Sequence, residues 1–327
     1  MKRLWLATLL LAAFPLMGLD AALTPAAAQK YPSRPIRVML PFAPGSVSDV
    51  TLRIFADKLG ARLNTSIIVD NQPRAGGITA VTTTLSAPPD GYTLVTLSSS
   101  TAISVSLLKS LSYDPVNDFL PISGLSTFAN IVATNSGSKY QTLADVIAAA
   151  RAKPGTLNVG TTTVGATNNL AAHLWRSMSK LDFVIVPFRT PGELVTAAIR
   201  GDVDVIIQSF GALKSPMQSG QLRALGSTTG TRAAYAPDVP TVDEAGVKGF
   251  EVLTWNGFFA ATKTPPEIID LLNREMRAVL ADPDLRQRFL NLGLEPLPTT
   301  PGELTKLLKD EIQKWRQVID DAGIEKQ

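Results

Sequence analysis

The sequence predicts an α/β protein with mainly parallel sheets, folded as two closely joined lobes. The main observation is a series of short runs rich in β-branched residues that alternate with helical segments, an order typical of α/β proteins. Most of these runs are almost continuously apolar, as in strands that are buried on both faces. The expected strands cover residues 36–42, 66–71, 92–98, 131–135, 157–162, 183–188, 203–209 and 222–228.

Three of the expected helices have a clear start signal, in which a threonine is followed by proline and, three residues later, by glutamate. The threonine hydroxyl accepts a bond from an amide of the first turn, and the glutamate carboxylate binds back to the threonine amide. These signals begin at Thr190, Thr264 and Thr300. The last helix has an apolar packing face made of Leu304, Leu307, Leu308, Ile312, Trp315 and Ile319. Because no low-complexity linker interrupts the chain, the lobes should be joined by strands or short crossings.

The first 28 residues have the pattern of a secretory signal peptide. Lys2 and Arg3 precede an apolar run over residues 4–19, and residues 26–28 are all alanine. A transmembrane anchor is the competing interpretation, but the run is shorter than the roughly 20 apolar residues that a spanning helix needs. We therefore expect cleavage after Ala28, a mature protein in the periplasm and no membrane anchor.

Composition excludes several classes of function. The chain has 31 basic and 28 acidic residues, and 29 and 27 of them remain after the expected cleavage. These charges are scattered, and no basic stripe alternates with aromatic residues, so we expect no nucleic-acid partner. The absence of cysteine rules out disulfides and thiolate chemistry, and stability must come from an ordinary apolar core.

Catalysis is also disfavoured, because the usual residues are missing. The chain has one histidine, His173, and no G-x-S-x-G nucleophile motif. His173 falls in an expected helix over residues 168–178 whose apolar positions point inward, which indicates a structural or surface role. A single histidine among scattered carboxylates lacks the clustered spacing of metal ligands. We therefore expect no enzyme activity, no cofactor and no metal.

A loop suited to ligand contact follows the first expected strand and opens the first helix. In residues 41–49, two prolines stiffen the backbone and Gly45 permits close approach. Ser46 and Ser48 add donors, and Asp49 caps the helix or holds an ordered water. A purely structural turn is the alternative, and we favour ligand contact.

A second glycine-containing loop follows a later strand. Residues 160–165 read Gly-Thr-Thr-Thr-Val-Gly, which superficially resembles a phosphate loop but lacks its closing lysine and hydroxyl residue. The segment offers backbone amides and hydroxyls at a strand-to-helix turn, where the helix dipole favours an anion. A carboxylate is the anion that we expect there.

Short motifs along the mature chain carry a resemblance to a known family. They are Tyr31-Pro32, Pro41-Phe42-Ala43-Pro44-Gly45, Asn71-Gln72-Pro73-Arg74-Ala75-Gly76-Gly77, Pro89-Asp90-Gly91-Tyr92, Tyr113-Asp114-Pro115, Val186-Pro187-Phe188, Gly201-Asp202-Val203-Asp204 and Pro237-Asp238-Val239-Pro240-Thr241. In this order they resemble the periplasmic receptors of tripartite tricarboxylate transporters, also called the Bug family of extracytoplasmic solute receptors.

The resemblance implies a two-lobed fold of the type II periplasmic binding proteins, with crossing strands between the lobes and a ligand closed between them. Residues 29–127 and 254–327 would form one lobe and residues 128–253 the other. Family members bind small carboxylates, aromatic acids or related anions and deliver them to a membrane permease. We expect the same of this chain, as a monomer.

The resemblance places the ligand on the two loops and the neighbouring strand ends. One carboxylate is expected on the amides of Gly45 and Ser46, with the rest of the ligand held by residues 161–167. The expected ligand-binding residues are Phe42, Ala43, Pro44, Gly45, Ser46, Asp49, Ser98, Ser99, Thr161, Thr162, Thr163, Gly165, Ala166, Thr167, Phe188, Gln208 and Ser209.

The chain departs from the family pattern near this site. Ser46 replaces a second glycine, Asn169 stands where the family commonly has histidine, and Gln208 replaces an aspartate. The resemblance therefore does not identify the ligand.

Two other functions and one structural question stay open. The chain is alternatively a receptor that signals through a membrane sensor, or a secreted hydrolase with His173 as its base. Phe42 and Phe188 either stack on an aromatic ligand or pack the wall of the cleft.

Overall fold

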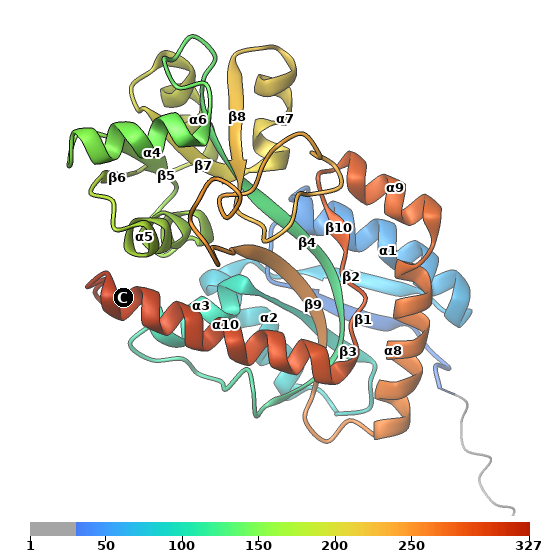
Figure 1. Ribbon diagram of the computed structural model, residues 1–327. Coiled ribbons are helices and arrows are strands. Elements are labelled where there is room, and N and C mark those ends of the chain that lie inside the picture. Colours follow the sequence, from blue (N-terminus) through green and yellow to red (C-terminus); the bar gives the residue numbers. More distant parts are fainter. Residues whose placement is uncertain (1–30) are drawn as a thin grey trace, which may run out of the picture.

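The computed structural model describes residues 31–327, so the expected signal peptide and its cleavage site lie outside the described residues. Within this range, ten strands form a curved sheet in the order β2-β1-β3-β9-β4-β7-β5-β6, and β8 and β10 also pair with β4. Figure 1 shows two lobes along this sheet, with the middle of the chain in the upper lobe and both ends of the described chain in the lower one.

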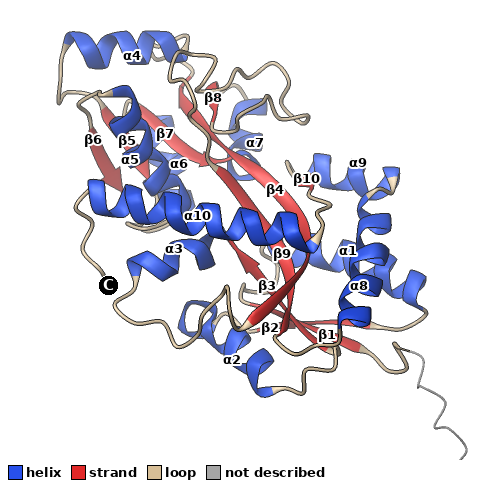
Figure 2. Ribbon diagram, turned by 60° about the horizontal axis from the view of Figure 1, so that its bottom comes forward, coloured by secondary structure: helices blue, strands red, loops and turns tan. Residues whose placement is uncertain are grey.

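The first lobe is built around a parallel group in which β1 pairs with β2 and β3, while β9 runs antiparallel to β3. Its strands are β1 (Ile36–Leu40), β2 (Ile67–Asn71), β3 (Thr93–Ser98), β9 (Leu253–Ala261) and β10 (Glu295–Pro296). Its helices are α1 (Val47–Leu63), the 3-10 helix η1 (Arg74–Gly77), α2 (Ile78–Ser86), α3 (Ser99–Leu107), α8 (Pro266–Leu280), α9 (Pro283–Asn291) and α10 (Pro301–Asp321). Helices α1, α8 and α9 cover one face of the sheet, and α2, α3 and α10 cover the other (Figure 2).

The second lobe repeats this plan with shorter strands. Its strand β5 pairs in parallel with β6 and β7. The strands are β5 (Asn158–Thr161), β6 (Val184–Pro187), β7 (Val205–Ser209) and β8 (Leu222–Ser227). The helices are α4 (Leu143–Ala152), α5 (Thr167–Ser179), α6 (Pro191–Arg200) and α7 (Phe210–Gln218).

One long strand, β4 (Phe119–Asn135), belongs to both lobes. Its first part pairs antiparallel with β9 as far as Ala129 opposite Leu253. From Asn130 onward it pairs antiparallel with β7 and from Ile131 with β8. The change of partner takes place without a break in the strand, so the two lobes share one continuous backbone element.

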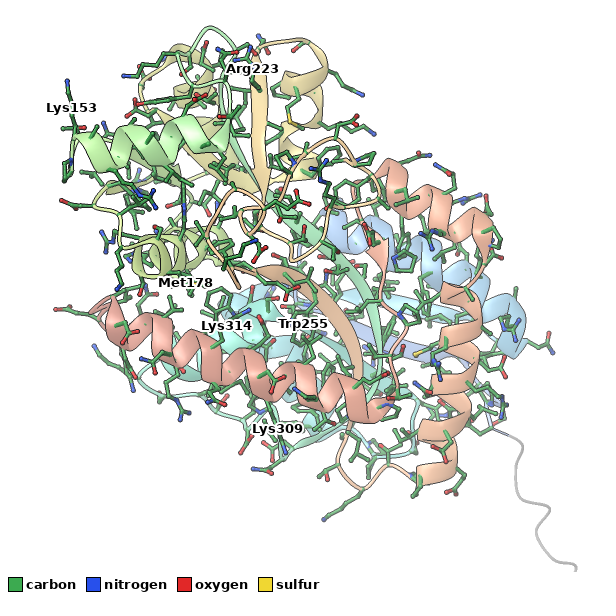
Figure 3. The ribbon with its side chains drawn as sticks, in the orientation of Figure 1. Lys153, Met178, Arg223, Trp255, Lys309 and Lys314 are labelled. Atoms are coloured by element: carbon green, nitrogen blue, oxygen red, sulfur yellow. The ribbon has the colours of Figure 1, made fainter. Side chains whose placement is uncertain are left out.

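The apolar core is also continuous between the lobes on the side of α3, α5 and α10. A single cluster of buried residues includes Trp175 from α5, Trp255 from β9 and Trp315 from α10, all fully buried. In Figure 3, Met178 on α5 and Lys314 on α10 mark the two helices that approach each other from opposite lobes. This packing places α5 against the first lobe.

The parallel strands of both lobes match the sequence expectation, whereas the two joining strands were only partly foreseen. Residues 119–130 of β4 and all of β9 were absent from the expected strands. Pro121 and Gly124 interrupt the β-pattern of β4, and the strand accommodates them with register shifts. A Cβ at Gly124 would lie 2.4 Å from the carbonyl oxygen of Leu297, so glycine is needed for the close approach of the segment that follows β10.

Two of the three expected helix starts are confirmed, because the hydroxyls of Thr190 and Thr300 accept bonds from the amides of Glu193 and Glu303. The expected return bond from the glutamate forms only at Thr300, since the Glu193 carboxylate accepts from the Arg189 amide and not from Thr190. The start expected at Thr264 is wrong, because the N-cap of α8 is Pro265 and the Thr264 hydroxyl donates to the carbonyl of Ala261. The two consecutive prolines explain the shift, since a residue before proline is held in extended conformation.

Over residues 31–327, no helix combines the length and the hydropathy needed to cross a bilayer.

Asn273 on α8 provides a test of how the long strand is held. Its buried amide nitrogen donates to the carbonyls of Ile122 (2.7 Å) and Thr299 (2.8 Å). We expect Asn273→Ala to lower the free energy of unfolding by about 2–4 kcal/mol, because two buried acceptors lose their donor. Equilibrium urea unfolding measures this, with the exposed Gln313→Ala as a control that should change stability by less than about 0.5 kcal/mol. If Asn273→Ala loses less free energy of unfolding than the control, Asn273 does not hold the long strand as described.

Candidate functional site

A cleft of about 430 Å³ lies where the two lobes meet. A volume of this size suits a small organic molecule. The residues that line the cleft come from β3, β4, β7 and β9 and from the beginnings of several helices. They are Phe42, Ser48, Ser98, Ser100, Phe128, Asn130, Thr162, Ala166, Thr167, Asn168, Pro191, Gln208, Ser209, Thr254 and Asn256.

Four helices from the two lobes begin at this cleft, and Pro191, the first residue of α6, also lines it. Their N-caps are Ser46 for α1, Ser98 for α3, Ala166 for α5 and Ser209 for α7. The first amides of a helix have no partner within the helix, and its dipole places a partial positive charge there. On α5 and α7, no side chain caps these amides. The cleft therefore has a positive potential suited to an anion, although it has no lysine or arginine in its lining.

Asp49 shapes the loop on the first lobe rather than facing the cleft. Its buried carboxylate accepts bonds from the Gly45 amide (2.9 Å), the Asn71 side chain (2.9 Å) and Arg53 (3.0 Å). Burial raises the pKa of Asp49, but these hydrogen bonds outweigh it and hold the pKa below its usual value. Asp49 therefore stays ionised and fixes the loop that carries Phe42 and the start of α1.

The amides of Gly45 and Ser46, on which a carboxylate is expected, already have hydrogen-bond partners within the loop. The Gly45 amide donates to Asp49, and the Ser46 amide donates to the carbonyl of Ala43 at 3.2 Å. Both amides are thus already occupied. The loop contributes the side chains of Phe42 and Ser48 instead, together with the N-terminus of α1.

The loop on the second lobe is held by two asparagines. The hydroxyl of Thr162 donates to Asn168 (2.6 Å), which in turn donates to the carbonyl of Ile207 (2.8 Å). Asn169 donates to the Thr161 hydroxyl (3.0 Å) and accepts from the Gly165 amide (3.2 Å). Asn169, which replaces the common histidine of the family, is therefore a buried support of this loop and does not line the cleft.

Gly165 also brings the lobes into contact. Its φ is +84°, a conformation that favours glycine, and a Cβ there would lie 2.3 Å from the Leu107 side chain on α3. The loop of the second lobe therefore touches the first lobe beside the cleft.

The floor of the cleft contains buried polar atoms without partners. Among the described residues, the side-chain nitrogens of Asn130 and Gln208 and the hydroxyl of Thr254 make no hydrogen bond. These residues lie on β4, β7 and β9, which are adjacent in the sheet. Because buried polar groups are nearly always hydrogen-bonded, the three atoms are available for a ligand or for water.

The cleft contains seven of the expected ligand-binding residues, and these are Phe42, Ser98, Thr162, Ala166, Thr167, Gln208 and Ser209. The ten that do not line it are Ala43, Pro44, Gly45, Ser46, Asp49, Ser99, Thr161, Thr163, Gly165 and Phe188. Several of these support the site: Ser99, for example, accepts from the Trp255 amide and donates to the Leu253 carbonyl. Phe188 packs against the core of the second lobe.

Ser48, which the sequence analysis named as a donor of the first loop, also lines the cleft. The lining further includes polar residues that the sequence did not indicate, namely Ser100, Asn130, Asn168, Thr254 and Asn256. Asn130, Thr254 and Asn256 lie on the joining strands, whose positions no local pattern indicated. Ser48 and Ser100 lie two residues after the N-caps of α1 and α3. A helix start rich in hydroxyl residues after a buried strand, the pattern that indicated the two loops, could therefore have indicated Ser100 as well.

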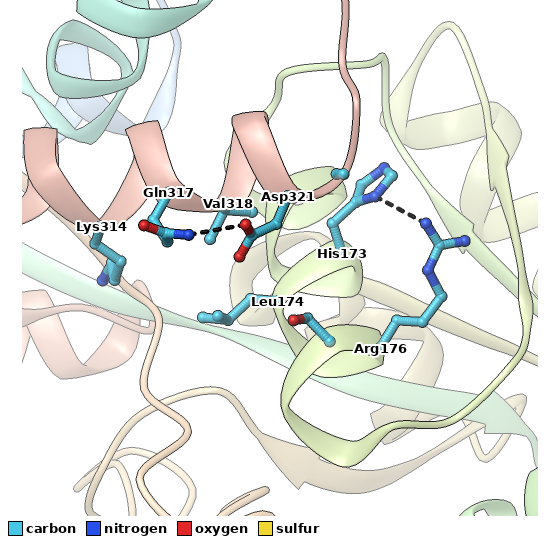
Figure 4. A pocket seen from close by; sticks show the side chains of 9 residues that line it. His173, Leu174, Arg176, Lys314, Gln317, Val318 and Asp321 are labelled. Atoms are coloured by element: carbon cyan, nitrogen blue, oxygen red, sulfur yellow. Dashed lines mark hydrogen bonds between the residues drawn. The ribbon is translucent and has the colours of Figure 1, made fainter.

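His173 lies in a separate crevice of about 340 Å³ between α5 and α10 (Figure 4). Ser177 and Asp321 line the same crevice, but no hydrogen bond joins either of them to the histidine. His173 is paired with Arg176 (3.4 Å) and Asp321 accepts from Gln317 (2.8 Å). Burial, with the adjacent positive charge of Arg176, lowers the pKa of His173 to about 4. This arrangement does not activate a serine nucleophile.

Within residues 31–327, no group of three or more histidine or acidic side chains is placed to hold a metal ion.

Comparison with known proteins identifies the family. Residues 51–324 match the model of the tripartite tricarboxylate transporter family receptor. This match covers most of the chain. The chain belongs to this receptor family. It is therefore a solute-binding receptor and not an enzyme.

Relatives and solved structures agree with this membership over nearly their full lengths. The receptor is 32% identical to Protein BugT of Bordetella pertussis, over 91% of this chain and 92% of that protein. It is similar to Rpa4515 of R. palustris with adipate (28% identity, TM-score 0.76, 90% and 99% covered). It is also similar to MatC of Rhodopseudomonas palustris with bound malate (29% identity, TM-score 0.71, 88% and 100% covered). The expected fold of a periplasmic binding protein is thus confirmed.

Replacing Asp49 tests its role in the receptor's first loop. We expect Asp49→Ala to lower the free energy of unfolding by about 1.5–3 kcal/mol, because it removes a buried charged acceptor. The Gly45 amide should also exchange its hydrogen at least tenfold faster. Asp57→Ala, an exposed position on the same helix, is the matched control and should leave both quantities unchanged. Unaltered exchange at Gly45 would refute the role.

His173 should make stability depend on pH. The unfolded chain protonates this histidine near its ordinary pKa of 6.5, whereas the folded receptor does so only near pH 4. Between these values the unfolded state binds more protons, so the free energy of unfolding should fall as pH drops from about 6.5 to 4. Urea unfolding at several pH values should show a shallower fall for His173→Gln, while the carboxylates titrate alike in both proteins. Parallel profiles would contradict the pKa shift.

Proposed function

We propose that the receptor captures a small carboxylate anion in the cleft between its lobes. The observation that carries this proposal is the lining, which joins four helix N-termini to hydroxyl and amide groups and contains no charged side chain. Helix N-termini stabilise an anion, and neutral donors bind its oxygens without burying a fixed cation.

The solved relatives support the same class of ligand. Rpa4515 is described with adipate and MatC with bound malate, and both are small carboxylates. Each shares its fold with this receptor over nearly the whole chain. Because identity stays below 30%, the proposal extends to the class of ligand and not to either acid.

Ligand contact is proposed for residues from both lobes. They are Phe42, Ser48, Ser98, Ser100, Asn130, Thr162, Ala166, Thr167, Gln208, Ser209, Thr254 and Asn256. A ligand held from both sides binds the closed arrangement more tightly than the open one and shifts the population toward it.

The division of the lobes follows the pairing of the long strand. We propose that residues 29–127 and 254–327 form one lobe and residues 128–253 the other. The supporting observation is that β4 exchanges its partner β9 for β7 and β8 between Ala129 and Ile131. Rotation about this segment would open and close the cleft.

Membership of the receptor family also suggests a role in the cell. We propose that the signal peptide is removed after Ala28, that the receptor acts as a monomer in the periplasm, and that its closed form docks to the permease of a tripartite transporter. The family description, which names these transporters, supports the partner.

A thermal unfolding panel tests the ligand class. Mature protein is unfolded and refolded to remove bound ligand, then heated with mono-, di- and tricarboxylates and with the corresponding uncharged amides. A carboxylate at about 100 times its Kd should add ~2.7 kcal/mol and raise Tm by several degrees, and its amide should not. If no carboxylate shifts Tm after refolding is verified, the proposal fails.

A further inference from the structure

The unpartnered donors at the cleft floor indicate which ligands the receptor accepts. Nine buried side-chain atoms lack a hydrogen-bond partner among the described residues, and three of them line this one cleft. They are the side-chain nitrogens of Asn130 and Gln208 and the hydroxyl of Thr254. Asn130 and Gln208 are only 3% and 5% exposed, so their amides are deeply buried within the cleft wall.

The orientation of the Gln208 amide is set by its neighbour. Its Oε1 accepts the backbone N–H of Ser209 at 2.7 Å, at the start of α7. The reverse orientation would place two donors against each other, so Nε2 must be the end without a partner. The group of Gln208 that is left without a partner beside the cleft is therefore a donor and not an acceptor.

No group in the lining offers a charge to a cationic ligand. The lining contains no aspartate or glutamate, and Asp49, the nearest carboxylate on the first loop, is occupied by Gly45, Asn71 and Arg53. A ligand ammonium would lie either beside the positive helix starts or beside the amide donors of the floor. Both surroundings are unfavourable to it.

We infer that Gln208, with Asn130 and Thr254, forms a specificity floor that requires a second carboxylate on the ligand and rejects its amino-substituted counterpart. This inference rests on the proposed binding of carboxylates. One carboxylate lies at the helix starts, near Ser48 and Ser100, and the other receives the floor donors. An ordinary dicarboxylate satisfies both ends, whereas an amino dicarboxylate brings an ammonium that finds only neutral hydroxyl and amide oxygens and no anionic partner in the lining.

The substitution Gln208→Glu tests this directly, because it keeps the shape of the side chain and replaces the donor by a carboxylate oxygen. The probes are two matched pairs, malate with aspartate and adipate with 2-aminoadipate. For the wild-type protein, calorimetric titration should give at least 30-fold weaker binding of the amino acid in the pair that binds. In Gln208→Glu, affinity for the dicarboxylate should fall at least tenfold, and the preference over its amino counterpart should shrink or reverse.

Two controls keep the test decisive. Gln218→Glu makes the same charge change at an exposed position at the end of α7 and should keep wild-type affinities. Gln208→Leu removes the donor without adding charge, so it should lose dicarboxylate affinity and gain none for the amino acid, even if Gln208→Glu fails to fold.

The outcomes separate this inference from the proposed function. If the wild-type protein binds a dicarboxylate and the Gln208 variants keep its affinity and selectivity, the floor is refuted while carboxylate binding stands. Wild-type binding of the amino acid equal to that of its partner also refutes the floor. If none of the four acids binds the wild-type protein, the inference fails; whether the proposed function fails with it is decided by the wider carboxylate panel.

Discussion

The continuous strand β4 is the element on which the rest of the structure depends. Its 17 residues pair first with β9 and then with β7 and β8, so the backbone bonds of one strand align both lobes. Because side chains alternate along strands, the same pairing that joins the lobes also directs Asn130 and Thr254 to the cleft and Trp255 to the core. The floor of the binding site and the join between the lobes are therefore one piece of sheet.

The electrostatics of the cleft follow from its position at the ends of strands. In each lobe a parallel strand ends at the cleft and a helix begins there, which brings α1, α3, α5 and α7 together without any charged side chain in the lining. The charged residues Asp49 and Arg53 near the cleft form an ion pair with each other and stabilise the first loop. In a lining without charged side chains, the positions of the hydrogen-bond donors and acceptors select the anion. Small differences in these groups therefore decide which anion binds.

Much of the site was predictable because local chemistry determines it. Proline, glycine and hydroxyl residues after a buried strand indicate a helix start, and this placed Phe42, Thr162 and Thr167 at the cleft. The same reasoning could not show that the amides of Gly45 and Ser46 already donate to Asp49 and Ala43 within the loop. The first part of β4, which Pro121 and Gly124 interrupt, was missed because its pairing depends on partners distant in the sequence.

The sequence by itself determined the α/β class, the two loops, the absence of catalytic residues and the receptor family, because each depends on residue types and short spacings. Only the tertiary structure decided that Asn130, Gln208 and Thr254 meet on one floor and that His173 lies in a different crevice. The physical reason is that three strands that lie far apart in the sequence become neighbours only when the sheet forms, and their buried polar side chains then border the same cleft.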